Sequence, residues 1–134
     1  MKLNCDLGEG LDEIDTLLMP HIDMASIACG GHAGNTASMA RSIALAKQHH
    51  TSIGAHPSYP DRENFGRLSL DLEPSALFDS LCQQIKTLTE QAHAFDAALD
   101  YIKPHGALYN DAWKKPLVQQ TLLRVAAQFS LPLV

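Results

Sequence analysis

Short apolar segments alternate with longer segments of helical periodicity along this sequence. Helices are predicted over four ranges: 11–19, 36–49, 74–97 and 116–129. Between them lie four strand candidates, at 2–6, 22–28, 51–55 and 99–102, and a fifth strand begins near residue 130. Strands that alternate with helices predict a parallel sheet with right-handed crossovers. The expected fold class is therefore α/β.

The helix over 74–97 has the strongest pattern. Pro74 suits a first helical turn. The apolar residues that follow recur at spacings of three and four, which predicts one core-facing stripe: Leu77, Leu81, Ile85, Leu88, Ala92 and Phe95. By contrast, residues 61–72 are polar and irregular, and long loops in compact domains are often functional.

Composition and net charge exclude some classes of protein. The chain has 134 residues, enough for one domain with a core. The formal net charge of −5, without blocks of like charge, argues against a nucleic-acid or membrane surface as partner. No apolar run is long enough to span a bilayer, and no signal-like segment opens the sequence. Three widely spaced cysteines predict reduced thiols and a cytoplasmic location.

Ionisable side chains follow every predicted strand, beside glycine or proline. Asp6 and Glu9 follow the first strand and His32 the second. The third is followed by His56, and the fourth by Lys103 and His105. Because loops at the carboxyl ends of parallel strands meet on one side of a sheet, these groups are expected to converge in one pocket.

The chemistry of this set leaves two alternatives open. Asp6, His32, His56 and His105 are ligand types for a divalent metal ion such as zinc or manganese. Without a metal, the same groups are candidates for general acid–base catalysis, with Lys103 stabilising negative charge. The structural alternative is that His32 and His56 only hydrogen-bond the backbone at tight turns. No nucleotide-binding motif is present.

Five segments of this sequence resemble the signature blocks of the LamB/YcsF family. They occur in the family's order and are spread over essentially the whole chain: 3–10, 27–34, 53–61, 65–67 and 103–110. The resemblance implies a seven-stranded (β/α) barrel related to the glycoside hydrolase/deacetylase superfamily. It also implies a part in the ATP-dependent opening of 5-oxo-L-proline to L-glutamate, together with two partner subunits. Family members are roughly twice this length.

Residues 1–134 are therefore expected to form a single barrel domain, incomplete at its C-terminus, with four βα units and the start of a fifth strand. Open sheet edges make such a piece liable to associate, so a homo-oligomer is one expectation. The implied catalytic residues are Asp6, His32, His56, Lys103 and His105. The implied substrate-binding residues are Asn4, Glu9, Arg67, Tyr109 and Asn110.

Two other functions fit the same residues. One is a metal-dependent deacetylase or amidohydrolase that acts alone on a sugar-like substrate, without ATP or partners. The other is a non-catalytic subunit that only binds partners. In either case the side chains at the strand ends must converge if the sequence-based interpretation of the site is correct.

Overall fold

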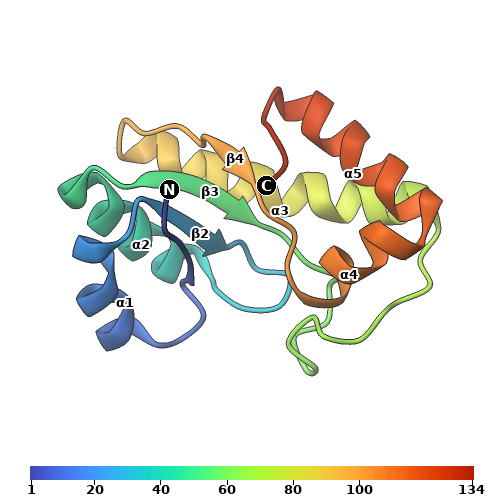
Figure 1. Ribbon diagram of the computed structural model, residues 1–134, viewed down its shortest axis with the longest axis horizontal. Coiled ribbons are helices and arrows are strands. Elements are labelled where there is room, and N and C mark those ends of the chain that lie inside the picture. The colour runs from blue at the N-terminus through green and yellow to red at the C-terminus, as the bar shows by residue number, and fades with distance from the viewer.

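A four-stranded parallel sheet forms the centre of the computed structural model, which describes all of residues 1–134 (Figure 1). The strands are β1 (Asn4–Leu7), β2 (Met24–Ala28), β3 (Ser52–His56) and β4 (Tyr101–Ile102). Their order in the sheet is β1-β2-β3-β4. Each crossover thus moves one strand in the same direction, without the reversal that defines a doubly wound sheet. Leu133 forms a further parallel bridge with Ile102, beyond β4.

Five α-helices and one 3₁₀ turn connect the strands (Figure 1). In chain order they are α1 (Asp12–Leu18), η1 (Met19–His21), α2 (Thr36–His49), α3 (Pro74–Ala94), α4 (Gly106–Lys114) and α5 (Pro116–Phe129). Helix α3 packs against both α2 and α5. None of the helices combines the length and hydropathy that crossing a bilayer requires.

Local sequence explains where these helices begin. Asn35 caps α2: its side chain accepts from the backbone N–H of Ser38 at 3.0 Å, and the Ser38 hydroxyl accepts from the Asn35 N–H at 2.9 Å. This reciprocal pair satisfies two amide groups that a helix start leaves free. Pro74 and Pro116 occupy first-turn positions, where the missing N–H of proline costs nothing.

The two faces of the sheet differ in character. On one face, Leu7, Ile27 and Ile102 belong to a core cluster of 23 buried residues that includes side chains of the helices. Because side chains alternate along a strand, the other face carries Asn4, Ser26, Gly54 and Tyr101.

That second face holds a buried polar network. The Tyr101 hydroxyl lies 3.1 Å from both the Ser26 hydroxyl and the Asn4 amide nitrogen, and Ser26 donates to Asn4 Oδ1 at 2.9 Å. The Tyr101 ring lies across Gly54, where an added Cβ would be 2.2 Å from the ring. Glycine at this position is therefore what admits the ring to the sheet surface.

The α/β class and the parallel sheet are confirmed. Helix α4 was not among the four helices predicted from the sequence. Pro104 and Gly106 are typical of turns, and only Ala107, Leu108, Ala112 and Lys114 of this helix are good helix formers. The predicted helix over 74–97 ends earlier, at Ala94, and Asp96 takes a left-handed conformation with φ of 52°.

Candidate active site

The site begins with an ion pair between the ends of β1 and β4. Lys103 Nζ lies 2.7 Å from Asp6 Oδ1 and 3.4 Å from Asn4 Oδ1. The polar network of Ser26 and Tyr101 fixes Asn4. Lys103 is therefore held by both Asn4 and Asp6. Asp6 Oδ2 is also 3.4 Å from His56 Nε2, which links this pair to the histidines.

Two histidines from neighbouring strand ends meet directly. His56 Nε2 and His105 Nδ1 are 3.1 Å apart, and both side chains are buried. The other ring nitrogen of each bonds a backbone carbonyl: His56 Nδ1 reaches Lys103 O at 2.6 Å, and His105 Nε2 reaches Phe65 O at 2.9 Å. Each ring is thereby fixed in both position and tautomer.

The third histidine comes from the loop after β2. His32 Nε2 lies 2.7 Å from Glu9 Oε1, and the carboxylate is also 3.7 Å from His105 Nδ1. The rings of His32 and His105 stack, with centroids 3.6 Å apart and planes 7° from parallel. His32 Nδ1 is buried without a hydrogen-bond partner. One cluster therefore unites the loops after β1, β2, β3 and β4.

Burial and neighbouring charges set the protonation of the cluster. Burial and the neighbouring imidazoles lower the pKa of His105 to about 4. Burial also lowers the pKa of His32, although the contact with Glu9 opposes this. Burial would raise the pKa of Glu9, but its hydrogen bond from His32 outweighs this and lowers the pKa. Burial would raise the pKa of Asp6 too, yet the adjacent imidazole and the Lys103 ammonium hold it far below its usual range. Near neutral pH the site therefore contains the ionised carboxylates of Asp6 and Glu9 beside the neutral rings of His32 and His105.

The long loop between β3 and α3 supports the cluster. Phe65 takes a left-handed conformation with φ of 54°, and its ring packs edge-on against His32 and His105. The next carbonyl, of Gly66, accepts from the Ala107 N–H at 3.0 Å. The loop thus supplies the carbonyl that fixes His105 and also joins the start of α4.

A polar hollow of about 290 Å³ opens beside the cluster. Its lining includes the ion pair, two of the histidines and the start of α4: Asp6, His56, Lys103, Pro104, His105, Gly106, Tyr109 and Asn110. This volume is at the small end of the range for ligand pockets. Glu9 and His32 line a second hollow of about 340 Å³.

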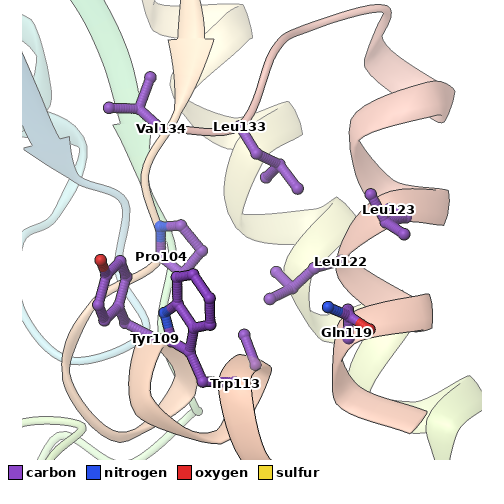
Figure 2. Close-up of a pocket in the computed structure, with 9 residues that line it drawn as sticks. Pro104, Tyr109, Trp113, Gln119, Leu122, Leu123, Leu133 and Val134 are labelled. Carbon is purple, nitrogen blue, oxygen red and sulfur yellow. The ribbon is translucent and has the colours of Figure 1, made fainter. Parts of the chain in front are cut away.

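An apolar hollow of about 250 Å³ adjoins the first one, sharing Pro104 and Tyr109 (Figure 2). Trp113, Leu122, Leu123 and Leu133 complete most of its wall. Because no carboxylate, imidazole or amine side chain lines it, acid–base or metal chemistry belongs to the polar hollow.

The predicted residues have different outcomes in the structure. Asp6, His32, His56, Lys103 and His105 come together as expected. Glu9 lies within the cluster, and Asn4 beneath it. Tyr109 and Asn110 are exposed and line the polar hollow. Arg67 is exposed and stacks on the Phe65 ring, with Cζ 5.4 Å from the centroid. It is not among the residues that line the polar hollow.

The sequence-based interpretation missed three contributors. Ser26 and Tyr101 form the network that holds Asn4, and Phe65 contributes a backbone carbonyl. Ser26 could have been found from the sequence, because it is a lone serine among apolar residues in β2. A backbone acceptor leaves no signature in side-chain identities.

One group of four atoms has the composition of a metal site. Glu9, His32, His56 and His105 each offer one ligand atom, and these atoms lie within 4.8 Å of one another. Asp6, which was predicted as a ligand, is outside this group.

Sheet topology and site together define a parallel α/β protein whose ionisable groups gather at the carboxyl ends of sequential strands. The sequence model of the LamB/YcsF family matches residues 1–134. The chain belongs to the LamB/YcsF family.

Curated relatives agree with this assignment. A protein of Vibrio parahaemolyticus that is named as a 5-oxoprolinase component is 42% identical over 138 residues, covering 100% of this chain and 55% of the relative. A Pseudomonas putida protein with the same kind of name is 44% identical over 140 residues, covering 100% of this chain and 54% of the relative. Both names designate one subunit of that enzyme. The chain thus spans about half the length of these relatives.

A solved structure extends the comparison to three dimensions. The crystal structure of a lactam utilization protein from Thermus thermophilus superposes with a TM-score of 0.92 at 32% sequence identity. The match covers 99% of this chain and 56% of that one.

Proposed function

We propose that this chain contributes the strand-end site of a cytoplasmic 5-oxoprolinase, which opens 5-oxo-L-proline to L-glutamate with ATP and two partner subunits. The names of the relatives support the reaction. In this proposal the four sequential parallel strands are the first part of a closed, seven-stranded (β/α) barrel. The pairing of Leu133 with Ile102 is consistent with a fifth strand at that position.

The observation that carries the proposal is the meeting of Lys103 and Asp6 with three buried histidines beside a small polar hollow. The substrate is a five-membered lactam that carries one carboxylate. Lys103 is the cation at the hollow, so it is assigned to bind the carboxylate or a phosphate group. Arg67 is a second, exposed cation that stacks on Phe65, and Tyr109 and Asn110 supply part of the wall.

Opening the ring requires activation because the amide is resonance-stabilised and the ring has little strain. In the proposed reaction, ATP phosphorylates the amide oxygen, in a step carried at least partly by the partner subunits. A water oxygen then bonds to the activated carbon, the ring C–N bond breaks and the nitrogen gains a proton, which leaves an acyl phosphate. A second water hydrolyses this acyl phosphate to L-glutamate and inorganic phosphate. Asp6 and the histidines direct the water and that proton, since neutral imidazole both accepts and donates near neutral pH.

The test is turnover of the chain combined with the two partner subunits. His105→Ala is expected to lower ATP-dependent glutamate formation by about 10²–10⁴-fold, the usual contribution of a general acid or base. His93→Ala, an exposed histidine on α3, is the matched control and should keep full activity. Thermal unfolding shows whether each variant is folded. Full activity of a folded His105→Ala variant would end this assignment.

A metal-dependent deacetylase is the second candidate, and the Glu9 and histidine group is the observation that favours it. It predicts that the metal-loaded chain alone releases acetate from an acylated sugar, with no ATP. A non-catalytic role predicts instead that 5-oxoproline binds, while His105→Ala leaves turnover of the complex unchanged.

A further inference from the structure

The hydrogen bonds of His56 and His105 determine where their protons are. A carbonyl oxygen only accepts, so His56 Nδ1 carries the hydrogen in its 2.6 Å contact with Lys103 O. For the same reason His105 Nε2 carries the hydrogen in its 2.9 Å contact with Phe65 O. In the neutral rings, the remaining nitrogens, His56 Nε2 and His105 Nδ1, each present a lone pair.

These two lone pairs face each other. The nitrogens are 3.1 Å apart, and two acceptors at that distance repel unless a cation lies between them or beside both. The Glu9 carboxylate, 3.7 Å from His105 Nδ1, adds a negative charge to the same place. Both histidines are at least nine-tenths buried, so bulk water does not relieve the repulsion. The arrangement is therefore built for a cation.

The geometry favours a metal ion as that cation. Two nitrogens that bind one tetrahedral zinc ion at about 2.05 Å lie about 3.3 Å apart, close to the observed 3.1 Å. Histidines that bind metals usually donate their outer N–H to a carbonyl or carboxylate, which aims the inner lone pair. Both His56 and His105 do so here, through backbone carbonyls that cannot titrate.

We propose that His56 Nε2, His105 Nδ1 and the Glu9 carboxylate bind one divalent transition-metal ion. The ion is zinc, cobalt or manganese. Two imidazoles and one carboxylate are a common catalytic set, and they leave a coordination position for water or substrate. With the ion bound, His56 and His105 would serve the proposed reaction as its ligands and not as free acid–base groups. Binding of the ion alone is therefore tested separately from turnover.

The same geometry assigns different roles to His32 and Asp6. His32 Nε2 donates to Glu9 at 2.7 Å and the ring stacks on His105, so it positions two ligands without being one. Asp6 is outside the group of close ligand atoms: Lys103 engages its Oδ1 at 2.7 Å, and its Oδ2 lies 3.4 Å from His56 Nε2. Asp6 is thus placed beside the ion and not on it.

The experiment is a titration of the chelator-treated chain with Co²⁺ and with Zn²⁺, followed by calorimetry and by the visible absorption of bound Co²⁺. One ion per chain is expected. His56→Ala, His105→Ala and Glu9→Gln should each weaken binding by more than about 100-fold, beyond the usual effect of an outer-shell residue. His32→Ala should weaken it by about 10-fold, Asp6→Asn by less than that, and the exposed control His93→Ala not at all.

Two outcomes would overturn the proposal. The first is the absence of binding by the folded wild-type chain at millimolar ion. The second is binding that survives in a double variant of His56 and His105, which would place the ion elsewhere. Imidazole ¹⁵N spectra supply an independent readout: added Zn²⁺ should shift His56 Nε2 and His105 Nδ1 and leave His93 unchanged. A proton shared between His56 Nε2 and His105 Nδ1 at saturating Zn²⁺ would also contradict the proposal.

Discussion

His105 is held by the backbone carbonyls of two other residues, Pro57 and Phe65. Its backbone N–H donates to Pro57 O at 2.8 Å, while its ring donates to Phe65 O. The next residue, Gly106, has φ of 57°, and a Cβ there would lie 2.6 Å from Gly66 O. The glycine therefore lets the loop carbonyls approach the start of α4.

Gly106→Ala is predicted to displace the loop from His105. The added methyl group meets a backbone oxygen and the left-handed conformation becomes strained, so we expect a loss of about 1–3 kcal/mol in the free energy of unfolding. Urea denaturation measures it. Gly10→Ala is the matched control, since Gly10 also has positive φ but nothing within 4 Å of the added atom. Equal losses in the two variants would show that the close approach is unimportant.

Asp111 anchors the same loop from α4. Its carboxylate accepts from the Tyr59 hydroxyl at 2.7 Å and from Ser69, and Lys115 Nζ lies 3.1 Å away. Burial would raise the pKa of Asp111, but the hydrogen bonds from Ser69 and Tyr59 and the contact with Lys115 outweigh it and lower the pKa. The ionised form is therefore the stabilising one.

This lowered pKa predicts a pH-dependent effect of Asp111→Asn. A carboxyl group with a depressed folded-state pKa stabilises above its unfolded pKa, about 3.9, and loses that contribution as pH falls through the folded value. We expect the variant to be about 1–3 kcal/mol less stable at pH 7, with the difference shrinking below about pH 4. Chemical denaturation across pH tests this. The exposed control Asp79→Asn should show little difference; a gap for Asp111→Asn that stays constant into acid would contradict the prediction.

At the scale of elements, the polar face of the sheet depends on Gly54. Any side chain there meets the Tyr101 ring, whose hydroxyl holds Asn4 and Ser26. The lysine of the site rests on this network through Asn4. The packing of Tyr101 of β4 on Gly54 of β3 thus helps to place Lys103 in the site.

Gly54→Ala is expected to destabilise the chain by about 1–3 kcal/mol, as overpacking does. If the ring is the cause, the cost should largely vanish in a Tyr101→Ala background, so the double-mutant cycle is strongly non-additive. Thermal and urea unfolding of the four proteins give the cycle. Additive effects would mean that the ring is not what Gly54 accommodates.

Much of the architecture was predictable from periodicity. The strands and the helices α2, α3 and α5 follow apolar spacings, and parallel topology alone implied that strand-end residues converge. What could not be predicted depends on the loop paths. Glu9 and not Asp6 joins the histidine group because the chain turns at Gly8, whose N–H bonds Asp15 at 2.8 Å. Helix α4 was not predicted, because Pro104 and Gly106 near its start are typical of turns.

At the scale of the whole molecule, one exposed surface is strongly apolar. It lies where α4 and α5 face the chain end, and it includes Trp113, Leu123 and Val134, which are 79%, 57% and 52% exposed (Figure 2). These three side chains also line the apolar hollow beside Pro104 and Tyr109. It lies beside the outer edge of the sheet, where Leu133 bridges Ile102.

Trp113 is the single tryptophan and so reports directly on this surface. In dilute solution its fluorescence is expected to have the red-shifted emission of a hydrated indole and to be readily quenched by acrylamide. Unfolding in urea should therefore change the quenching little. Strong protection in the dilute folded chain would contradict the exposed placement. Protection that grows with chain concentration would instead indicate a homo-oligomer formed through this face.

The pairing of residues 132–134 with β4 has a dynamic consequence. The Ile102 N–H donates to Pro132 O and its carbonyl accepts from the Val134 N–H, both at 2.9 Å, while the Lys103 N–H donates to Ala55 O on the opposite side. Hydrogen exchange at the Ile102 amide therefore requires the last residues to detach. Exchange at that one amide would therefore measure how often residues 132–134 leave β4 while Lys103 stays bonded to β3.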